Sequence, residues 1–227
     1  MTYEPVKYVI FDMDGLLLNS EHIFRDVLRK ILTRYGKSYD NEITLKTLGM
    51  VPQESYATFI KEYKLPTTLS QFFEEIRTEL LPALQYAEFL PGVERLVNHL
   101  KSNNIPIAIA TSSGKETYEE KIKRHTSFFD KFHHIVLGSI DPDVKKGKPA
   151  PDIFLVCASR FPGNPAPREC LVFEDAPNGV QAAVSAGMQV VMVPDSLVPL
   201  EKRKLATKVL NSLLEFKPEE FGLPKFD

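Results

Sequence analysis

The sequence predicts an α/β protein in which a parallel sheet carries helices on both faces and a separate block of helices follows the first strand. Two observations lead to this prediction. Short, solidly apolar runs alternate with segments of helical spacing through the second half of the chain, which is typical of parallel strands buried on both faces. After the first strand, Glu21–Tyr35 has helical spacing and Asn41–Tyr86 holds helical signals only. We therefore expect an α/β core domain of residues 1–17 and 89–227, with an all-helical domain of residues 18–88 inserted into it.

The expected strands are short apolar runs bounded by charged residues, glycine or proline. They are Val6–Phe11, Pro106–Ala110, Ile135–Gly138, Leu171–Phe173 and Val190–Val193. The expected helices have apolar residues three or four positions apart and proline or glycine near their ends. They are Glu21–Tyr35, three pieces between Asn41 and Tyr86, Val93–Leu100, a helix from Lys115, Asp152–Phe161 and Pro177–Ala186. The tail indicates one more helix near Glu201–Leu214.

The charge and the apolar patterning argue against several classes of function. The 227 residues include 28 Lys and Arg against 30 Asp and Glu, a net charge of −2, which does not favour a nucleic-acid polymer or an anionic membrane as partner. No apolar run approaches the roughly 18 residues that a membrane span needs. The two cysteines, Cys157 and Cys170, fit a reducing compartment. We expect a cytoplasmic protein that is a monomer or a weak dimer.

Polar side chains follow four of the expected strands. They are Asp12 and Asp14 after the first strand, Thr111 and Ser112 after the second, Lys148 in the loop after the third, and Glu174 with Asp175 after the fourth. Ligands of open parallel sheets bind beyond the carboxyl ends of the strands, so we expect these side chains to meet at one edge. Each alone has an ordinary explanation, such as a helix cap or a solvated lysine. The prediction of a site depends on the whole set.

The chemistry of this set favours phosphoryl transfer. Clustered carboxylates repel one another unless a cation neutralises them, and Mg²⁺ prefers oxygen ligands together with a substrate phosphate. Lys148 and Thr111 could contact phosphate oxygens. Asp12 could attack phosphorus as a nucleophile, and Asp14 could exchange a proton with the leaving group and with water. We expect Asp12 and Asp14 to be the catalytic residues.

The motif Phe11-Asp12-Met13-Asp14-Gly15, followed in order by Thr111, Lys148 and Glu174-Asp175, resembles the haloacid dehalogenase-type phosphohydrolases. That resemblance implies a Rossmann-like core with a small helical cap and a Mg²⁺ ion. Its implied metal ligands are Asp12, the backbone carbonyl of Asp14, and Asp175, with Glu174 directly behind them. Its implied phosphate-binding residues are Thr111, Ser112 and Lys148.

Longer segments, such as FDMDGLLLNSE and CLVFEDAPNGVQAAVSAGMQVVMVPD, resemble a branch of that family that dephosphorylates pseudouridine 5′-monophosphate. A small polyol or sugar phosphate such as glycerol 3-phosphate is the alternative substrate, and a non-catalytic phosphate-ligand sensor is the alternative from another class. The sequence argues against a sugar-phosphate mutase. Phe24 stands where such mutases have a histidine, and the expected substrate loop, about Gly49–Glu54, has no Lys or Arg. Phe24 or Tyr56 could line the substrate pocket.

Overall fold

The computed structural model describes residues 3–47 and 52–226, and its centre is a parallel sheet. The strands are β1 (Tyr8–Phe11), β2 (Ile107–Thr111), β3 (His134–Leu137), β4 (Cys170–Glu174), β5 (Gln189–Met192) and β6 (Lys208–Val209). Their order is β3-β2-β1-β4-β5-β6, and every neighbouring pair is parallel. The predicted α/β class is confirmed, and β1 lies in the middle of the sheet.

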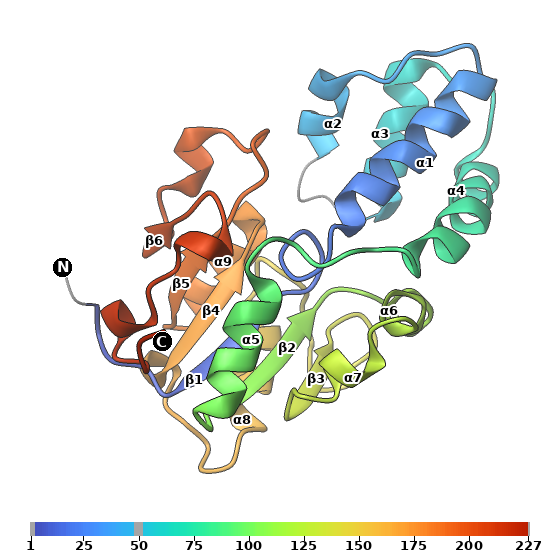
Figure 1. Ribbon diagram of the computed structural model, residues 1–227. Helices are drawn as coiled ribbons and strands as arrows, with labels where there is room; N and C mark the ends of the chain where they lie inside the picture. Colours follow the sequence, from blue (N-terminus) through green and yellow to red (C-terminus); the bar gives the residue numbers. More distant parts are fainter. Residues whose placement is uncertain (1–2, 48–51, 227) are drawn as a thin grey trace.

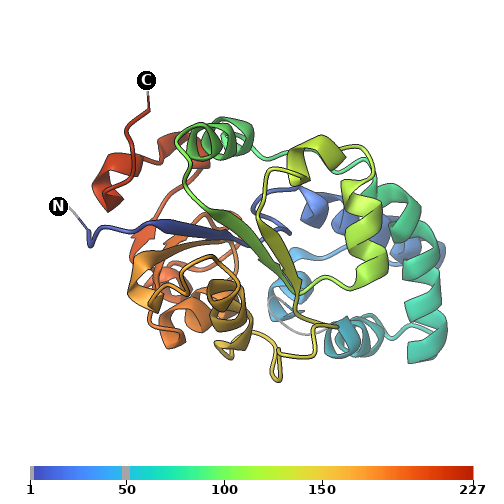
Figure 2. The same ribbon diagram turned by 90° about the horizontal axis from the view of Figure 1, so that it is seen from below.

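Helices cover both faces of this sheet. They are α5 (Val93–Ser102), α6 (Lys115–Ile122), α7 (Thr126–Phe129), α8 (Asp152–Ser159) and α9 (Pro177–Ser185). Figure 2 shows the sheet between α5 on one side and α8 with α9 on the other. Successive strand residues point to opposite faces, so the two faces of β1 contribute to two separate cores. Phe11 belongs to the core under α5, and Ile10 belongs to the core under α8 and α9.

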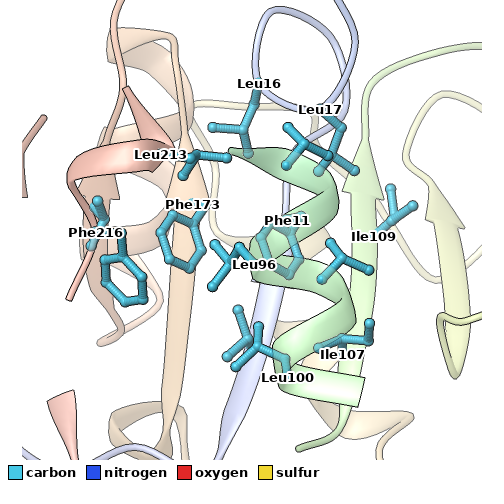
Figure 3. Close-up of a cluster of buried hydrophobic side chains, with 14 of the residues drawn as sticks. Phe11, Leu16, Leu17, Leu96, Leu100, Ile107, Ile109, Phe173, Leu213 and Phe216 are labelled. Atoms are coloured by element: carbon cyan, nitrogen blue, oxygen red, sulfur yellow. The ribbon is translucent and has the colours of Figure 1, made fainter. Parts of the chain in front are cut away.

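The core under α5 joins segments that lie far apart in the sequence. Phe11 stacks on Phe173 of β4 with a ring-centroid distance of 5.0 Å, and Leu96 of α5 packs against the same cluster. Figure 3 shows these side chains together with Phe216 from the tail. This close-packed apolar cluster holds Phe11, the last residue of β1, in position. The next residue, Asp12, is therefore positioned by the core.

Four helices form a separate group, which we call the helical unit. They are α1 (Ser20–Arg34), α2 (Asn41–Thr47), α3 (Pro52–Tyr63) and α4 (Leu69–Leu84). The unit lies on the side toward which the strand arrows point in Figure 1, and it has a core of its own that includes Leu28, Phe59 and Phe72. A capping box of Thr68 and Gln71 begins α4. The helices expected between 18 and 88 are present, whereas the domain boundaries stay a prediction.

Two chain segments connect the helical unit to the sheet, and they run side by side. Leu18 pairs with Phe89 as an antiparallel bridge, and the backbone N–H of Leu90 donates to the carbonyl of Leu17 over 3.1 Å. An ion pair of 2.8 Å between Arg25 of α1 and Asp195 after β5 adds a contact beside them. The two connecting segments therefore lie together next to the carboxyl ends of the strands.

The helix predicted near Glu201–Leu214 is wrong. This segment consists of 3₁₀ turns at Leu200–Arg203 and Leu213–Glu215 with β6 between them. Lys208 and Val209 pair with β5, and the N–H of Leu210 donates to the carbonyl of Met192 over 2.9 Å. Hydrogen bonding to the open edge of the sheet outweighs the local helical pattern here.

None of the helices in the described part of the chain combines the length and apolar character of a membrane span.

Candidate active site

The predicted site residues meet at the carboxyl edge of the sheet because β1 lies between β2 and β4. Asp12 directly follows β1, Thr111 is the last residue of β2, and Glu174 is the last residue of β4. Phe11 is in register with Phe173, and the N–H of Asp12 donates to the Phe173 carbonyl over 2.9 Å. Three strands thus deliver a carboxylate, a hydroxyl group and a second carboxylate to one place.

Lys148 joins this edge from the loop between β3 and α8. Its Nζ donates to Asp12 Oδ1 over 2.5 Å, to Glu174 Oε1 over 2.6 Å and to the carbonyl of Ala110 over 3.2 Å. The Lys148 side chain is only 5% exposed. Burial alone would lower the pKa of Lys148, but the charges of Asp12 and Glu174 outweigh it and raise that pKa. The ammonium group is therefore a permanent positive charge between two carboxylates.

Three carboxylates lie close enough to share a cation. Asp12, Glu174 and Asp175 each offer an oxygen within 4.8 Å of the others. Burial raises the pKa of Asp12 to about 7, although Lys148 opposes this effect, and burial with the neighbouring carboxylates raises the pKa of Asp175 well above its usual range. One ammonium group does not balance three acidic groups. The surplus negative charge and the all-oxygen donor set fit a hard divalent cation.

Glu174 differs from Asp12 and Asp175 because hydrogen bonds from its surroundings occupy both of its carboxylate oxygens. Its Oε2 accepts the backbone N–H groups of Asp175 over 2.9 Å and Ala176 over 3.0 Å, while its Oε1 accepts Lys148. Both oxygens of Glu174 therefore already accept hydrogen bonds. These contacts agree with the expectation that Glu174 lies behind the predicted metal ligands and orients them.

Gly15 allows the turn after Asp14 to approach Asp175. Its φ is +76°, a conformation that favours glycine, and a Cβ atom there would lie 2.2 Å from Asp175 Oδ2. The glycine of the motif is therefore required both by the backbone conformation and by the closeness of a predicted ligand.

The Asp14 carboxylate lies apart from the three-carboxylate cluster and is held by donors. Ser20 Oγ donates to Oδ1 over 2.6 Å, and Ser113 Oγ donates to Oδ2 over 2.7 Å. Lys121 forms an ion pair with the same carboxylate. Burial would raise the pKa of Asp14, but Lys121 and the hydroxyl groups outweigh it and lower that pKa to about 2. Asp14 is therefore ionised in this arrangement.

Sequence reasoning missed Lys121, which is only 6% exposed. It lies in a charged stretch, Glu119-Glu120-Lys121-Ile122-Lys123, that suggests a solvated helix face. The signal that could have found it is the phase of α6, because Tyr118 and Ile122 pack against the core and Lys121 lies three positions after Tyr118, next to that side of the helix. The pairing of Lys121 with Asp14 could not be derived from that phase.

Thr111 ends β2, and Ser112 begins the loop between β2 and α6. Thr111 is fully buried, its Oγ1 accepts the N–H of Ser113 over 3.0 Å, and it lies 3.4 Å from Asp14 Oδ2. Ser112 is exposed beside it. Lys148 contacts the carbonyl of Ala110, the residue before Thr111, so these two side chains lie near each other. Contact of Thr111, Ser112 and Lys148 with phosphate stays a prediction.

The helical unit holds the two aromatic side chains expected at the substrate pocket, and its Arg25 lines a small cavity together with Asp175. Phe24 stacks with Tyr56 at a centroid distance of 6.3 Å, and Tyr56 contacts Phe72 and Phe73. Of the expected substrate loop, residues 49–51 lie outside the described residues. A cavity of about 130 Å³ between α1 and the loop after β5 has Asp175 in its wall. A larger cavity of about 570 Å³, between α1 and α4, contains none of the predicted site residues.

Known proteins similar to this chain match it over nearly its whole length. The profile of haloacid dehalogenase-like hydrolases matches residues 9–193. A Drosophila melanogaster protein named as a probable pseudouridine-5′-phosphatase is 47% identical over 221 residues, covering 97% of this chain and 96% of that protein. The Arabidopsis thaliana protein named (DL)-glycerol-3-phosphatase 1, mitochondrial, is 46% identical over 224 residues, covering 97% of this chain and 75% of that protein.

A solved structure shares the fold. The crystal structure of a HAD family hydrolase from Deinococcus radiodurans R1, with bound phosphate and sodium, superposes with a TM-score of 0.82. The two chains are 24% identical, and the alignment covers 99% of this chain and 100% of that one. This likeness agrees with the predicted arrangement of sheet and helices.

Proposed function

Because the chain belongs to the haloacid dehalogenase-like hydrolase family, we propose that it hydrolyses phosphomonoesters through an aspartyl-phosphate on Asp12. Membership confirms the sequence-based prediction of a hydrolase of this family. The observation that carries the proposal is the buried contact of Lys148 with Asp12 beside two further carboxylates. A nucleophilic carboxylate among fixed positive charges is what phosphoryl transfer requires, since the reaction depends mainly on positioning and charge neutralisation.

Mg²⁺ is the proposed cofactor. The carboxylates of Asp12 and Asp175 and the backbone carbonyl of Asp14 would hold it, while Glu174 orients this group from behind. The fit follows from oxygen-only donors and from buried negative charge that Lys148 alone does not balance. When bound, the ion would neutralise these carboxylates and polarise the phosphoryl oxygens of the substrate.

The two catalytic residues have complementary roles. A carboxylate oxygen of Asp12 attacks phosphorus, the bond between phosphorus and the ester oxygen breaks, and the alcohol leaves with a proton from Asp14. Water then attacks phosphorus in the aspartyl-phosphate and gives a proton to Asp14, which releases inorganic phosphate and restores Asp12. Thr111, Ser112 and Lys148 hold the phosphoryl oxygens. Asp14 is ionised in this arrangement, which suits the second step, so it takes up a proton before it serves the first.

The helical unit, with proposed boundaries at residues 18 and 88, acts as a cap over the site. Its two connections run side by side at Leu18 and Phe89, next to Asp14, so a small rotation there would open or close the space above Asp12. Closure would exclude water and place side chains of the unit, with Phe24 and Tyr56 as candidates, against the organic part of the substrate.

The proposed substrate is pseudouridine 5′-monophosphate, hydrolysed in the cytoplasm by a monomer or a weak dimer. The relative in Drosophila melanogaster supports this choice, because it matches over nearly its whole length. Glycerol 3-phosphate is the second candidate, supported by a relative of almost equal identity. Both substrates are alkyl phosphates, so the same site chemistry serves either one. Binding of a phosphate ligand without turnover is the alternative from another class.

Phosphate release from a panel of nucleotide and sugar monophosphates tests the function. We expect the highest kcat/KM for pseudouridine 5′-monophosphate, loss of activity with EDTA and recovery with Mg²⁺. Asp12→Asn should abolish turnover, while Asp143→Asn, on an exposed loop, should leave it unchanged. Ligand binding without phosphate release would overturn the enzyme assignment, and a higher kcat/KM for glycerol 3-phosphate would select the second substrate.

A further inference from the structure

Lys121 is a buried ammonium group that the proposed mechanism does not use. Its side chain is 7% exposed although it lies on α6, a helix whose other lysine, Lys115, is 71% exposed. Within residues 3–47 and 52–226, Asp14 is the acidic partner with which Lys121 forms an ion pair. An ammonium group in such a place needs a compensating charge, so its burial and its contact with Asp14 belong together.

Lys121 also acts on Asp14 through a third side chain. Its Nζ donates to Ser113 Oγ over 2.8 Å, and Ser113 Oγ donates to Asp14 Oδ2 over 2.7 Å. An ammonium group can only donate, so the Ser113 oxygen must accept from Lys121 and keep its own hydrogen for Asp14. Lys121 therefore sets the direction of the second hydrogen bond as well as forming the ion pair.

The contacts of Asp14 come from four places in the fold. Ser20 is the first residue of α1 in the helical unit, Thr111 ends β2, Ser113 lies in the loop after β2, and Lys121 is on α6. Without Lys121, the carboxylate would keep hydroxyl donors only, and one of them, that of Ser113, would be free to rotate. Proton transfer needs the carboxyl group within hydrogen-bond reach of the reacting oxygen, and a misplacement of about 1 Å can reduce the rate about 100-fold.

We propose that Lys121 is a positioning residue for Asp14, holding its carboxylate in place both directly and through Ser113. This inference rests on the proposed role of Asp14 in proton transfer to the leaving group. It adds a residue on α6 to the site, outside the motifs that identify the family. Lys121 does not contact the three-carboxylate cluster or Lys148, so its loss should leave metal and phosphate binding unchanged.

The first test compares leaving groups in Lys121→Met, which removes the charge and keeps the length of the side chain. We expect kcat/KM for the alkyl phosphate that is the best substrate to fall about 10- to 100-fold, because a misplaced acid can reduce the rate by up to about 100-fold. For 4-nitrophenyl phosphate, kcat/KM should change little, because 4-nitrophenolate leaves without a proton. The inhibition constant of inorganic phosphate should stay unchanged. Lys123→Met, which removes an exposed lysine just after α6, is the matched control.

The second test is a double-mutant cycle with Asp14→Asn. If Lys121 acts through Asp14, Lys121→Met should have no further effect on the alkyl phosphate once Asp14 is changed. Lys121→Arg keeps a positive charge at this position and should retain more of the kcat/KM for the alkyl phosphate than Lys121→Met does.

The outcomes separate this inference from the proposed function. If Asp12→Asn is inactive, three results would overturn the positioning role of Lys121. They are an equal loss for both leaving groups, no loss for the alkyl phosphate, and a full effect of Lys121→Met in the Asp14→Asn background. If Asp12→Asn and Asp14→Asn keep wild-type turnover, the proposed function itself is wrong. Circular dichroism and the phosphate inhibition constant show whether each variant is folded.

Discussion

Asp12→Asn removes a buried charge while keeping the shape of the side chain, and its effect on stability should depend on pH. In the metal-free protein, burial raises the pKa of Asp12 from its ordinary value near 3.8 to about 7. The folded state then binds this proton more tightly than the unfolded state does. The contribution of Asp12 to stability therefore falls as the pH rises from about 4 to about 7. Asparagine does not titrate, so the variant should lack this decrease.

The size of the effect follows from the two pKa values. One pKa unit corresponds to about 1.4 kcal/mol, so a difference of about three units amounts to roughly 4 kcal/mol above pH 7. Between about pH 5 and pH 8, the expected decrease is about 2.5 kcal/mol, because part of the titration is complete at the lower pH. The lost hydrogen bond to Lys148 does not alter this difference, since the raised pKa of Lys148 keeps it charged throughout.

Urea unfolding of both proteins in the presence of EDTA measures this difference. We expect the free energy of unfolding of Asp12→Asn, relative to that of wild type, to be about 2.5 kcal/mol larger at pH 8 than at pH 5, which means that the variant is relatively more stable at pH 8. Adding Mg²⁺ at pH 8 should stabilise the wild type more than the variant, because one proposed ligand carboxylate is missing. A relative stability that does not change with pH would refute the argument that buried, unneutralised charge dominates this site.

Three further substitutions test other parts of the site. Gly15→Ala should weaken Mg²⁺ binding, because the added Cβ would displace Asp175, and titration calorimetry measures this effect. It should also lower the free energy of unfolding by about 1–2 kcal/mol because of the positive φ, which urea unfolding measures. The control is Gly36→Ala, at φ +66° with open space around the added Cβ. It should lower the free energy of unfolding by about 1 kcal/mol and leave Mg²⁺ binding unchanged. Lys148→Met should abolish turnover and destabilise the metal-free protein by about 3–5 kcal/mol at pH 8; a stable, active variant would contradict its role between two carboxylates.

The fold was predictable wherever the pattern is local. The strands at Val9–Phe11 and Ile107–Ala110 are so apolar that only burial on both faces explains them, and the structure buries them completely. The edge strand at Lys208–Val209 was not predictable, because it depends on pairing with β5 rather than on its own residues. The order of the strands has the same nonlocal origin, so the sequence could not supply it.

The site was predictable from the rule that parallel strands end at one edge. Asp12, Thr111 and Glu174 meet there because their strands are neighbours, and the contacts of Lys148 follow from its loop after β3. The ion pair of Lys121 with Asp14 could not be predicted, because it depends on how α6 is placed relative to the turn after β1. The same holds for the separation of the Asp14 carboxylate from the three-carboxylate cluster.

Covalent phosphate on Asp12 is the most direct test of the mechanism. The wild-type enzyme is mixed with 4-nitrophenyl phosphate and Mg²⁺, quenched in acid within the first turnover, digested and analysed by mass spectrometry. We predict one phosphoryl group per active enzyme on the peptide that contains Asp12, with the site assigned to that residue. Full turnover with an unmodified Asp12, or with the phosphoryl group on another residue, would contradict the aspartyl-phosphate mechanism.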